Sequence, residues 1–133
     1  MHILAKIFIA LVAIEHIYIL WLEMFAWTTQ GKKTFKSLKP ELFEPTKALA
    51  ANQGLYNGFL AAGLFWSLFI TDSNWSYNVA YFFLGCVIVA GLYGAYSADK
   101  KIFFVQGVPA IIAMAAALLS KCCLWKKSIY FLG

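Results

Sequence analysis

Charged residues are scarce in this chain, and arginine is absent altogether. Only 13% of the 133 residues are charged, whereas 62% are hydrophobic. A soluble domain usually carries about 25% charged residues, so this composition excludes a water-soluble surface. The net charge of +5 comes from lysines beside hydrophobic segments. It favours attraction to anionic lipid headgroups and argues against a nucleic-acid partner.

Four apolar segments and their short connections take up nearly the whole chain and leave no residues for a soluble domain. They cover residues 3–27, 46–70, 77–96 and 102–120, and each is long enough to cross ~30 Å of hydrocarbon as a helix. The first segment is expected to stay in the mature protein, because Glu15 interrupts its apolar run and no cleavage site follows. The sequence therefore predicts an all-α polytopic membrane protein, a bundle of four transmembrane helices with short loops, as a single domain over residues 1–133.

Lysines are unevenly divided between the two sides of this predicted bundle. Seven lie in the first and third loops: Lys32, Lys33, Lys36, Lys39, Lys47, Lys100 and Lys101. Four lie on the other side, near the amino terminus and in the tail: Lys6, Lys121, Lys126 and Lys127. Because short cytoplasmic loops are rich in lysine and arginine, we predict that both termini lie outside.

Aromatic residues cluster near the predicted span ends, where amphipathic rings anchor a helix at headgroup level. They are Trp27, Trp66, Trp75, Tyr77, Tyr96 and Trp125. In the first loop, Pro40 and Pro45 bracket a four-residue stretch that we expect to form a short amphipathic turn on the membrane surface.

The first segment carries three ionisable residues among apolar neighbours, namely Glu15, His16 and Glu23. An ionised residue at the bilayer centre costs ~2.5 to 3.5 kcal/mol, so such residues usually face a cavity or a partner. His16 and Glu23 are about 20° apart around a helix and ~10 Å apart along it. All three side chains can therefore point into one wide interior sector, although they cannot all touch.

Consecutive membrane helices run in opposite directions, so polar residues on the other helices are predicted to lie at the same depth in the membrane as these three. The inner layer, nearest the cytoplasm, would contain Glu23, Asn52, Gln53 and Gln106. The central layer would contain Glu15, His16, Tyr56 and Asn57. The predicted pocket between the helices opens towards the cytoplasm.

Small residues predict where the helices approach closely. Gly54, Gly58 and Ala62 recur every four residues, a spacing that lets membrane helices pack backbone to backbone. Gly107 and Pro109 indicate a bend beside Gln106, because proline removes one intrahelical donor. Homodimerisation through a glycine-lined face is a further expectation.

Several functions are compatible with this polar cluster. The first is a small transporter or proton-coupled exporter, in which an embedded carboxylate exchanges a proton for a cationic substrate and His16 relays the proton. The second is a binding protein or enzyme for a lipophilic isoprenoid or quinone, with Glu and His as acid and base; the residues do not decide whether the chain is an enzyme. A third is structural, since buried amides hold membrane helices together.

No cofactor is expected, although a mononuclear metal at His16 and the carboxylates is a variant of either functional class. The expected partners are the lipid bilayer and a small molecule that the sequence does not name.

Three stretches resemble a known family: ALVAIEHIYILWLEMFAW, ALAANQGLYNGFLAAGL and FFLGCVIVAGLYGAYSADKKIFFVQGVPA. They are similar to a bacterial membrane family catalogued as a domain of unknown function, number 1304 in that series, through the combined elements E-H-x6-E, A-N-Q-G-x-Y-N-G and V-Q-G-x-P-A. The resemblance covers residues 3–118 and implies a four-helix protein of the bacterial cytoplasmic (inner) membrane. The family's polar positions map onto Glu15, His16, Glu23, Asn52, Gln53, Tyr56, Asn57 and Gln106.

Overall fold

The structure is a computed structural model that describes the backbone of residues 1–131 and the side chains of residues 1–123. Trp125, Lys126 and Lys127, which entered the predictions on anchoring and orientation, therefore have side chains outside the described residues. The described backbone is helical apart from short turns and loops.

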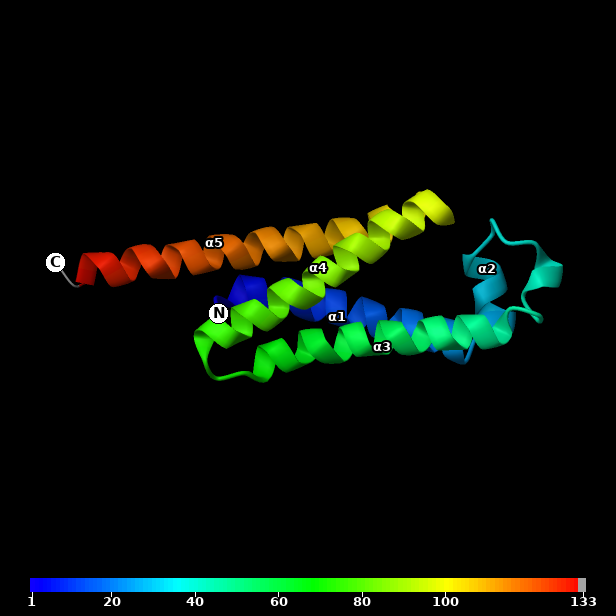
Figure 1. Ribbon diagram of the computed structural model, residues 1–133, viewed down its shortest axis with the longest axis horizontal. Coiled ribbons are helices and arrows are strands. Elements are labelled where there is room, and N and C mark those ends of the chain that lie inside the picture. Colours follow the sequence, from blue (N-terminus) through cyan, green and yellow to red (C-terminus); the bar gives the residue numbers. More distant parts are fainter. Residues whose placement is uncertain (132–133) are drawn as a thin grey trace.

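Four long helices make up the bundle (Figure 1). They are α1 (Ile3–Met24), α3 (Lys47–Phe69), α4 (Ser73–Ser97) and α5 (Val108–Phe131). Shorter elements are the π-helix η1 (Trp27–Gly31), the helix α2 (Lys32–Thr34), the 3-10 helix η2 (Pro40–Leu42) and the π-helix η3 (Phe103–Gly107). The described residues thus hold five α-helices rather than the predicted four, because three residues of the first loop form α2.

Helix boundaries depart from the predicted ones for identifiable local reasons. α4 begins four residues before the predicted start at Tyr77, because the Asp72 carboxylate accepts a hydrogen bond from the Trp75 backbone N–H at 2.8 Å and caps the helix. Near Gly107, where a proline bend was expected, the chain instead adopts the π-helix η3 just before Pro109. A π-helix accommodates extra backbone in a helix and often occurs at functional sites.

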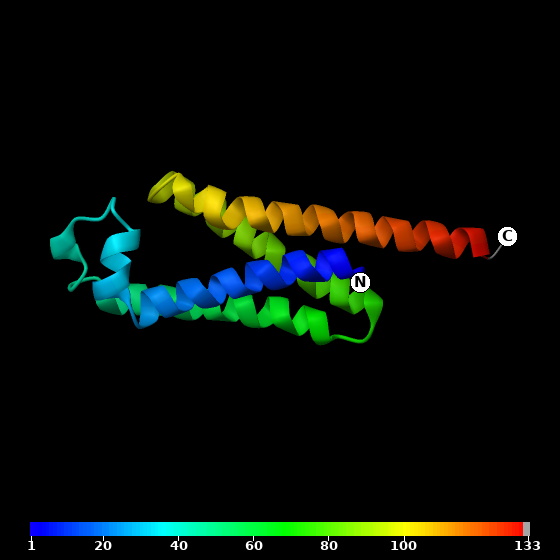
Figure 2. The same cartoon turned by 180° about the vertical axis from the view of Figure 1, so that it is seen from behind.

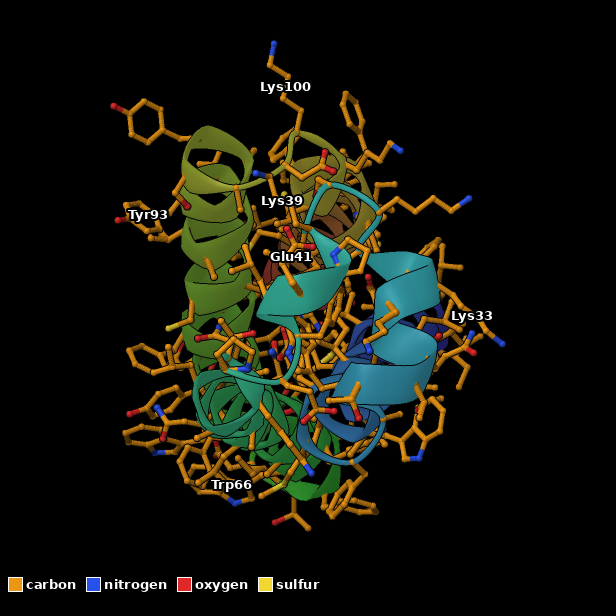
Figure 3. The ribbon with its side chains drawn as sticks, turned by 90° about the vertical axis from the view of Figure 1, so that its right-hand side faces the viewer. Lys33, Lys39, Glu41, Trp66, Tyr93 and Lys100 are labelled. Carbon is orange, nitrogen blue, oxygen red and sulfur yellow. The ribbon has the colours of Figure 1, made fainter. Side chains whose placement is uncertain are left out.

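The two lysine-rich loops lie at one end of the bundle, and the two described chain ends point to the other. Figures 1 and 2 show the 25–46 segment and the α4–α5 connection together at that end, which we call the lysine end. Seen along the bundle from this end, Lys33 and Lys100 project outwards (Figure 3). The carboxyl-terminal part of α5 extends beyond the other three helices (Figure 1).

Side chains from all four long helices form the apolar core. The core residues are Ile9, Val12, Ala13, Leu64, Ala80, Leu84, Val87, Ala110 and Ala113. Many of them are alanines, so the helices approach closely without large interlocking side chains, as is common in membrane bundles.

Three helical stretches are long and apolar enough to cross a membrane, namely Ile3–Met24, Ser73–Ser97 and Phe103–Cys123. They are compatible with a membrane-embedded protein. α3 has 23 residues, enough for ~35 Å at 1.5 Å per residue, but it is not one of the three. It carries the amides Asn52, Gln53 and Asn57, which lower its apolar character.

The first loop is a folded cap on the lysine end. Trp27 packs against Phe35 and Phe43 with ring centroids 5.2 and 4.9 Å apart, and its indole N–H donates to the Thr46 hydroxyl at 3.1 Å. Phe43 is only 1% exposed. The turn predicted between Pro40 and Pro45 is present as η2, and the aromatic contacts hold it against the helices.

Candidate functional site

A pocket of about 200 Å³ lies between α1 and η3 at the lysine end. Its α1 wall consists of Glu15, Tyr18, Ile19 and Leu22. These residues are spaced i, i+3, i+4 and i+7, so they share one face of the helix. Ile19 and Leu22 are buried and form the floor of the pocket.

The opposite wall comes from residues around η3, with Ile102, Val105 and Gln106 facing α1. Gly91 of α4 allows this placement, because a Cβ added there would lie 3.0 Å from the Gly107 backbone nitrogen. The two glycines therefore bring η3 and α4 into backbone contact, which fixes the position of the neighbouring Gln106.

The rim of the pocket is formed by residues from two loops. Thr34 and Phe35 come from the cap, and Asp99 and Lys101 come from the α4–α5 connection. None of these four was predicted to be a site residue, because residues so far apart in the chain give no local signal that they meet. The α1 residues Tyr18, Ile19 and Leu22 were also missed, although their spacing from Glu15 could have revealed them.

Among the described residues that line the pocket, Glu15 is the one with a buried polar atom that lacks a hydrogen-bond partner. This atom is its Oε1. A buried polar atom left unpaired costs ~1 to 3 kcal/mol, so a group that supplies a hydrogen bond or a positive charge would be stabilised there. Gln106 lines the same pocket and offers both a donor and an acceptor.

His16 is fully buried, at 0% exposure, one residue from Glu15. Its Nδ1 lies 2.8 Å from the Val12 carbonyl oxygen, one turn earlier in α1. A carbonyl only accepts, so Nδ1 carries a hydrogen and donates this bond. Nε2 has no hydrogen-bond partner among the described residues, and His16 is not part of the pocket lining.

Glu23 and Asn57 form a direct link between α1 and α3. The Asn57 side-chain amide donates to the Glu23 carboxylate at 2.8 Å and also approaches the Gln53 carbonyl oxygen at 3.2 Å. Gly54 permits the link, because a Cβ there would lie 3.1 Å from the Leu20 carbonyl oxygen. Asn57 thus lies at the level of Glu23, which corrects its predicted place in the central layer.

Asn52, Gln53 and Tyr56 lie on the exposed face of α3 and do not join the pocket. The buried face of α3 contains Ala50, Gly54, Asn57, Ala61 and Leu64. Residues one or two positions away from these turn about 100 to 200° around the helix. Asn52 and Gln53 were predicted to share a layer with Glu23, and Tyr56 to share one with Glu15. Both predictions considered depth along the bundle but not rotation about the helix axis, and all three side chains lie on the exposed face.

The eight predicted site residues therefore fall into separate groups. Glu15 and Gln106 share the pocket, Glu23 and Asn57 join two helices, and His16 is buried within α1. Among the described residues, no group of three or more His, Cys, Asp or Glu side chains is arranged to hold a metal ion.

The fold and the pocket define a class: an all-helical protein, with three helices apolar enough to span a membrane and an acidic residue in a pocket between two of them. Residues 10–118 match the family described as "Protein of unknown function (DUF1304)", and the chain belongs to that family. It is 34% identical over 119 residues to "Uncharacterized protein YpaA" of Lactococcus lactis, a match that covers 88% of this chain and 98% of the relative. No solved structure matches the chain.

Proposed function

We propose that the protein is a four-span transporter of the bacterial cytoplasmic membrane, a small proton-coupled exporter. In this proposal Glu15 holds a proton when the pocket is empty and exchanges it for a cationic substrate. The supporting observation is the buried, unpartnered Oε1 of Glu15 in a pocket that also contains Gln106. Glu23 and Asn57 are accounted for by the hydrogen bond between them, and the His16 Nδ1 by its bond to the Val12 carbonyl. The other three predicted residues lie on the exposed face of α3.

The pocket reaches one end of the bundle and not the other, as expected of a transporter that is open to one side of the membrane. The pocket reaches the lysine end through Thr34 and Lys101, whereas the closely packed core lies between it and the opposite end of the bundle. A transporter that works by alternating access exposes its site to one side at a time. The positive-inside pattern assigns the lysine end to the cytoplasm, so this conformation corresponds to the inward-open state.

The fourth span in this proposal is α3. It packs along α1 through Ala50, Gly54 and Asn57, and it connects to α4 by a turn at the end opposite the lysines (Figure 1). With α3 in the membrane, the two lysine-rich segments share one side and both termini lie on the other. Labelling of single cysteines introduced at Lys33 and Asn74 in intact cells and in inverted vesicles tests this topology; labelling of both from the same side would overturn it.

Proton release provides the test of function. Purified protein in weakly buffered detergent should release protons when the cation octylammonium is added as its chloride, and Glu15→Gln should abolish the release. Glu41→Gln is the matched control, because Glu41 is an exposed carboxylate in the cap (Figure 3), and it should behave as the wild type. Equal release from the wild type and Glu15→Gln would contradict the assignment of Glu15.

A second candidate function is a membrane-embedded binding protein or enzyme for a lipophilic ligand of the isoprenoid or quinone type. The observation that favours it is the apolar lining of the pocket, which includes Ile19, Leu22, Ile102 and Val105. Native mass spectrometry of protein extracted in mild detergent distinguishes this candidate, because a retained neutral lipid would be detected. If no ligand is retained, no proton is released and Glu15→Gln is as stable as the wild type, a structural role of the bundle remains.

A further inference from the structure

We infer that the substrate of this site is a lipophilic amine, an organic cation with an apolar tail. We further infer that it enters sideways from the bilayer between α1 and η3. This inference rests on the proposed function and specifies its substrate class and route of access. Four properties of the pocket support it: its charge, its size, the chemistry of its rim and the depth of Glu15.

The charged groups of the pocket select a cation. Glu15 and Asp99 are the two carboxylates of the lining, and Lys101 is its one ammonium group. Lys101 lies at the exposed rim, whereas Glu15 is half-buried between the helices. An ammonium head placed at Glu15 supplies the hydrogen bond that Oε1 lacks, and as it arrives the proton of Glu15 leaves to water, so charge within the pocket is conserved.

The size of the pocket allows a small head but no bulky body. Its volume of about 200 Å³ is below the ~300 to 1,000 Å³ of pockets that enclose a drug-sized ligand. At ~30 Å³ per molecule of liquid water, it corresponds to roughly seven waters. A ligand larger than this must leave part of itself outside.

The rim of the pocket shows where that outer part would lie. On the loop side the rim consists of Thr34 and Lys101, and Phe35, half-buried against Trp27, covers part of that opening. On the helix side the rim consists of Tyr18 and Val105, which are 48% and 55% exposed on the outer surface of the bundle. In a membrane this second opening faces lipid, so an apolar tail can stay in the hydrocarbon.

Because Glu15 lies deep in the bundle, the side opening is a shorter route to its carboxylate than the opening at the loops. Glu15 lies nine residues before the end of α1 at Met24, which is ~14 Å along the helix. A cation that enters from the loop would have to pass Phe35 and the apolar residues Leu22 and Ile19 to reach the carboxylate. A cation already in the bilayer passes only Tyr18 and Val105, and the Tyr18 ring can stabilise its charge by a cation–π contact.

The test compares two amines in nanodiscs of zwitterionic phosphatidylcholine, with binding to protein-free discs subtracted. Octylammonium should bind saturably at one per chain. Methylammonium should bind at least about fiftyfold more weakly, the difference that three methylene groups removed from water produce. Octanoate, with a similar tail and the opposite charge, should not bind.

Two pairs of variants locate the head and the tail. Glu15→Gln should weaken octylammonium binding at least about tenfold, whereas Glu41→Gln should leave it unchanged. Val105→Trp, which narrows the side opening at an exposed position that tolerates a larger side chain, should weaken octylammonium about tenfold and leave methylammonium unaffected. Phe104→Trp is its control, because Phe104 is also exposed on the outer surface, at 68%, but does not line the pocket.

The outcomes separate this inference from the proposed function. If methylammonium binds as tightly as octylammonium, or Val105→Trp weakens both equally, sideways entry of a lipophilic amine is wrong while a cation site at Glu15 stands. If octanoate binds as well as octylammonium, cation selectivity is wrong. If neither amine binds, and proton release is the same in Glu15→Gln as in the wild type, the proposed function fails together with the inference.

Discussion

Gly91 and Gly85 lie on the same helix, α4, and differ only in what surrounds them. A Cβ added at Gly91 would be 3.0 Å from the backbone nitrogen and 3.1 Å from the Cα of Gly107. Backbone atoms cannot rotate away as a flexible side chain would, so Gly91→Ala must push η3 and α4 apart. At Gly85 nothing lies within 4 Å of the added atom.

The magnitudes follow from these surroundings. Gly→Ala in a helix gains up to ~1 kcal/mol of helix propensity, and this gain is common to both variants. Forcing an extra carbon into a well-packed contact costs ~1 to 3 kcal/mol, and only Gly91→Ala bears that cost. The gain in helix propensity cancels when the two variants are compared. Gly91→Ala should therefore have a free energy of unfolding ~1 to 3 kcal/mol lower than that of Gly85→Ala.

Thermal unfolding in detergent, followed by tryptophan fluorescence, measures this difference. Gly85→Ala should melt at or above the wild-type temperature, and Gly91→Ala should melt below it. Because Gln106 precedes Gly107, Gly91→Ala should also weaken octylammonium binding, while Gly85→Ala should not. Equal melting temperatures for the two variants would refute the close approach of α4 and η3 on which the position of Gln106 depends.

Three further perturbations test the contacts that hold the bundle and its cap. A double-mutant cycle of Glu23→Ala and Asn57→Ala, measured by thermal unfolding, should give a coupling of ~0.6 to 1.7 kcal/mol; additive effects would contradict the hydrogen bond at 2.8 Å. Ser120→Ala should destabilise the protein by ~1 to 3 kcal/mol, because the serine hydroxyl accepts a hydrogen bond from the His2 backbone N–H and is hydrogen-bonded to the Tyr77 hydroxyl. An unchanged melting temperature would contradict these bonds. Phe43→Ala should make the cap accessible to trypsin, whereas Leu42→Ala, at a position 40% exposed, should not; equal cleavage of the two variants would contradict the packed cap.

The site could be predicted in part, and the reason differs from residue to residue. Glu15 and Gln106 were predicted from the cost of placing polar groups in apolar segments, and the structure places both in one pocket. Asn52, Gln53 and Tyr56 were predicted on the same ground, yet they face outwards. A polar residue in an apolar segment is a candidate site residue, but its polarity does not determine which way its side chain faces. For these three residues, that direction depends on the rotation of α3 relative to α1.

The helical class, the apolar segments and the distribution of lysines follow from the amino-acid sequence alone, because composition and residue spacing are local properties. Which polar side chains meet depends on how the helices pack. Gly54 and Gly91 bring backbones together, and these contacts set the rotation and register of the helices. Glu23 is thereby paired with Asn57, and Glu15 is left without a partner in the pocket.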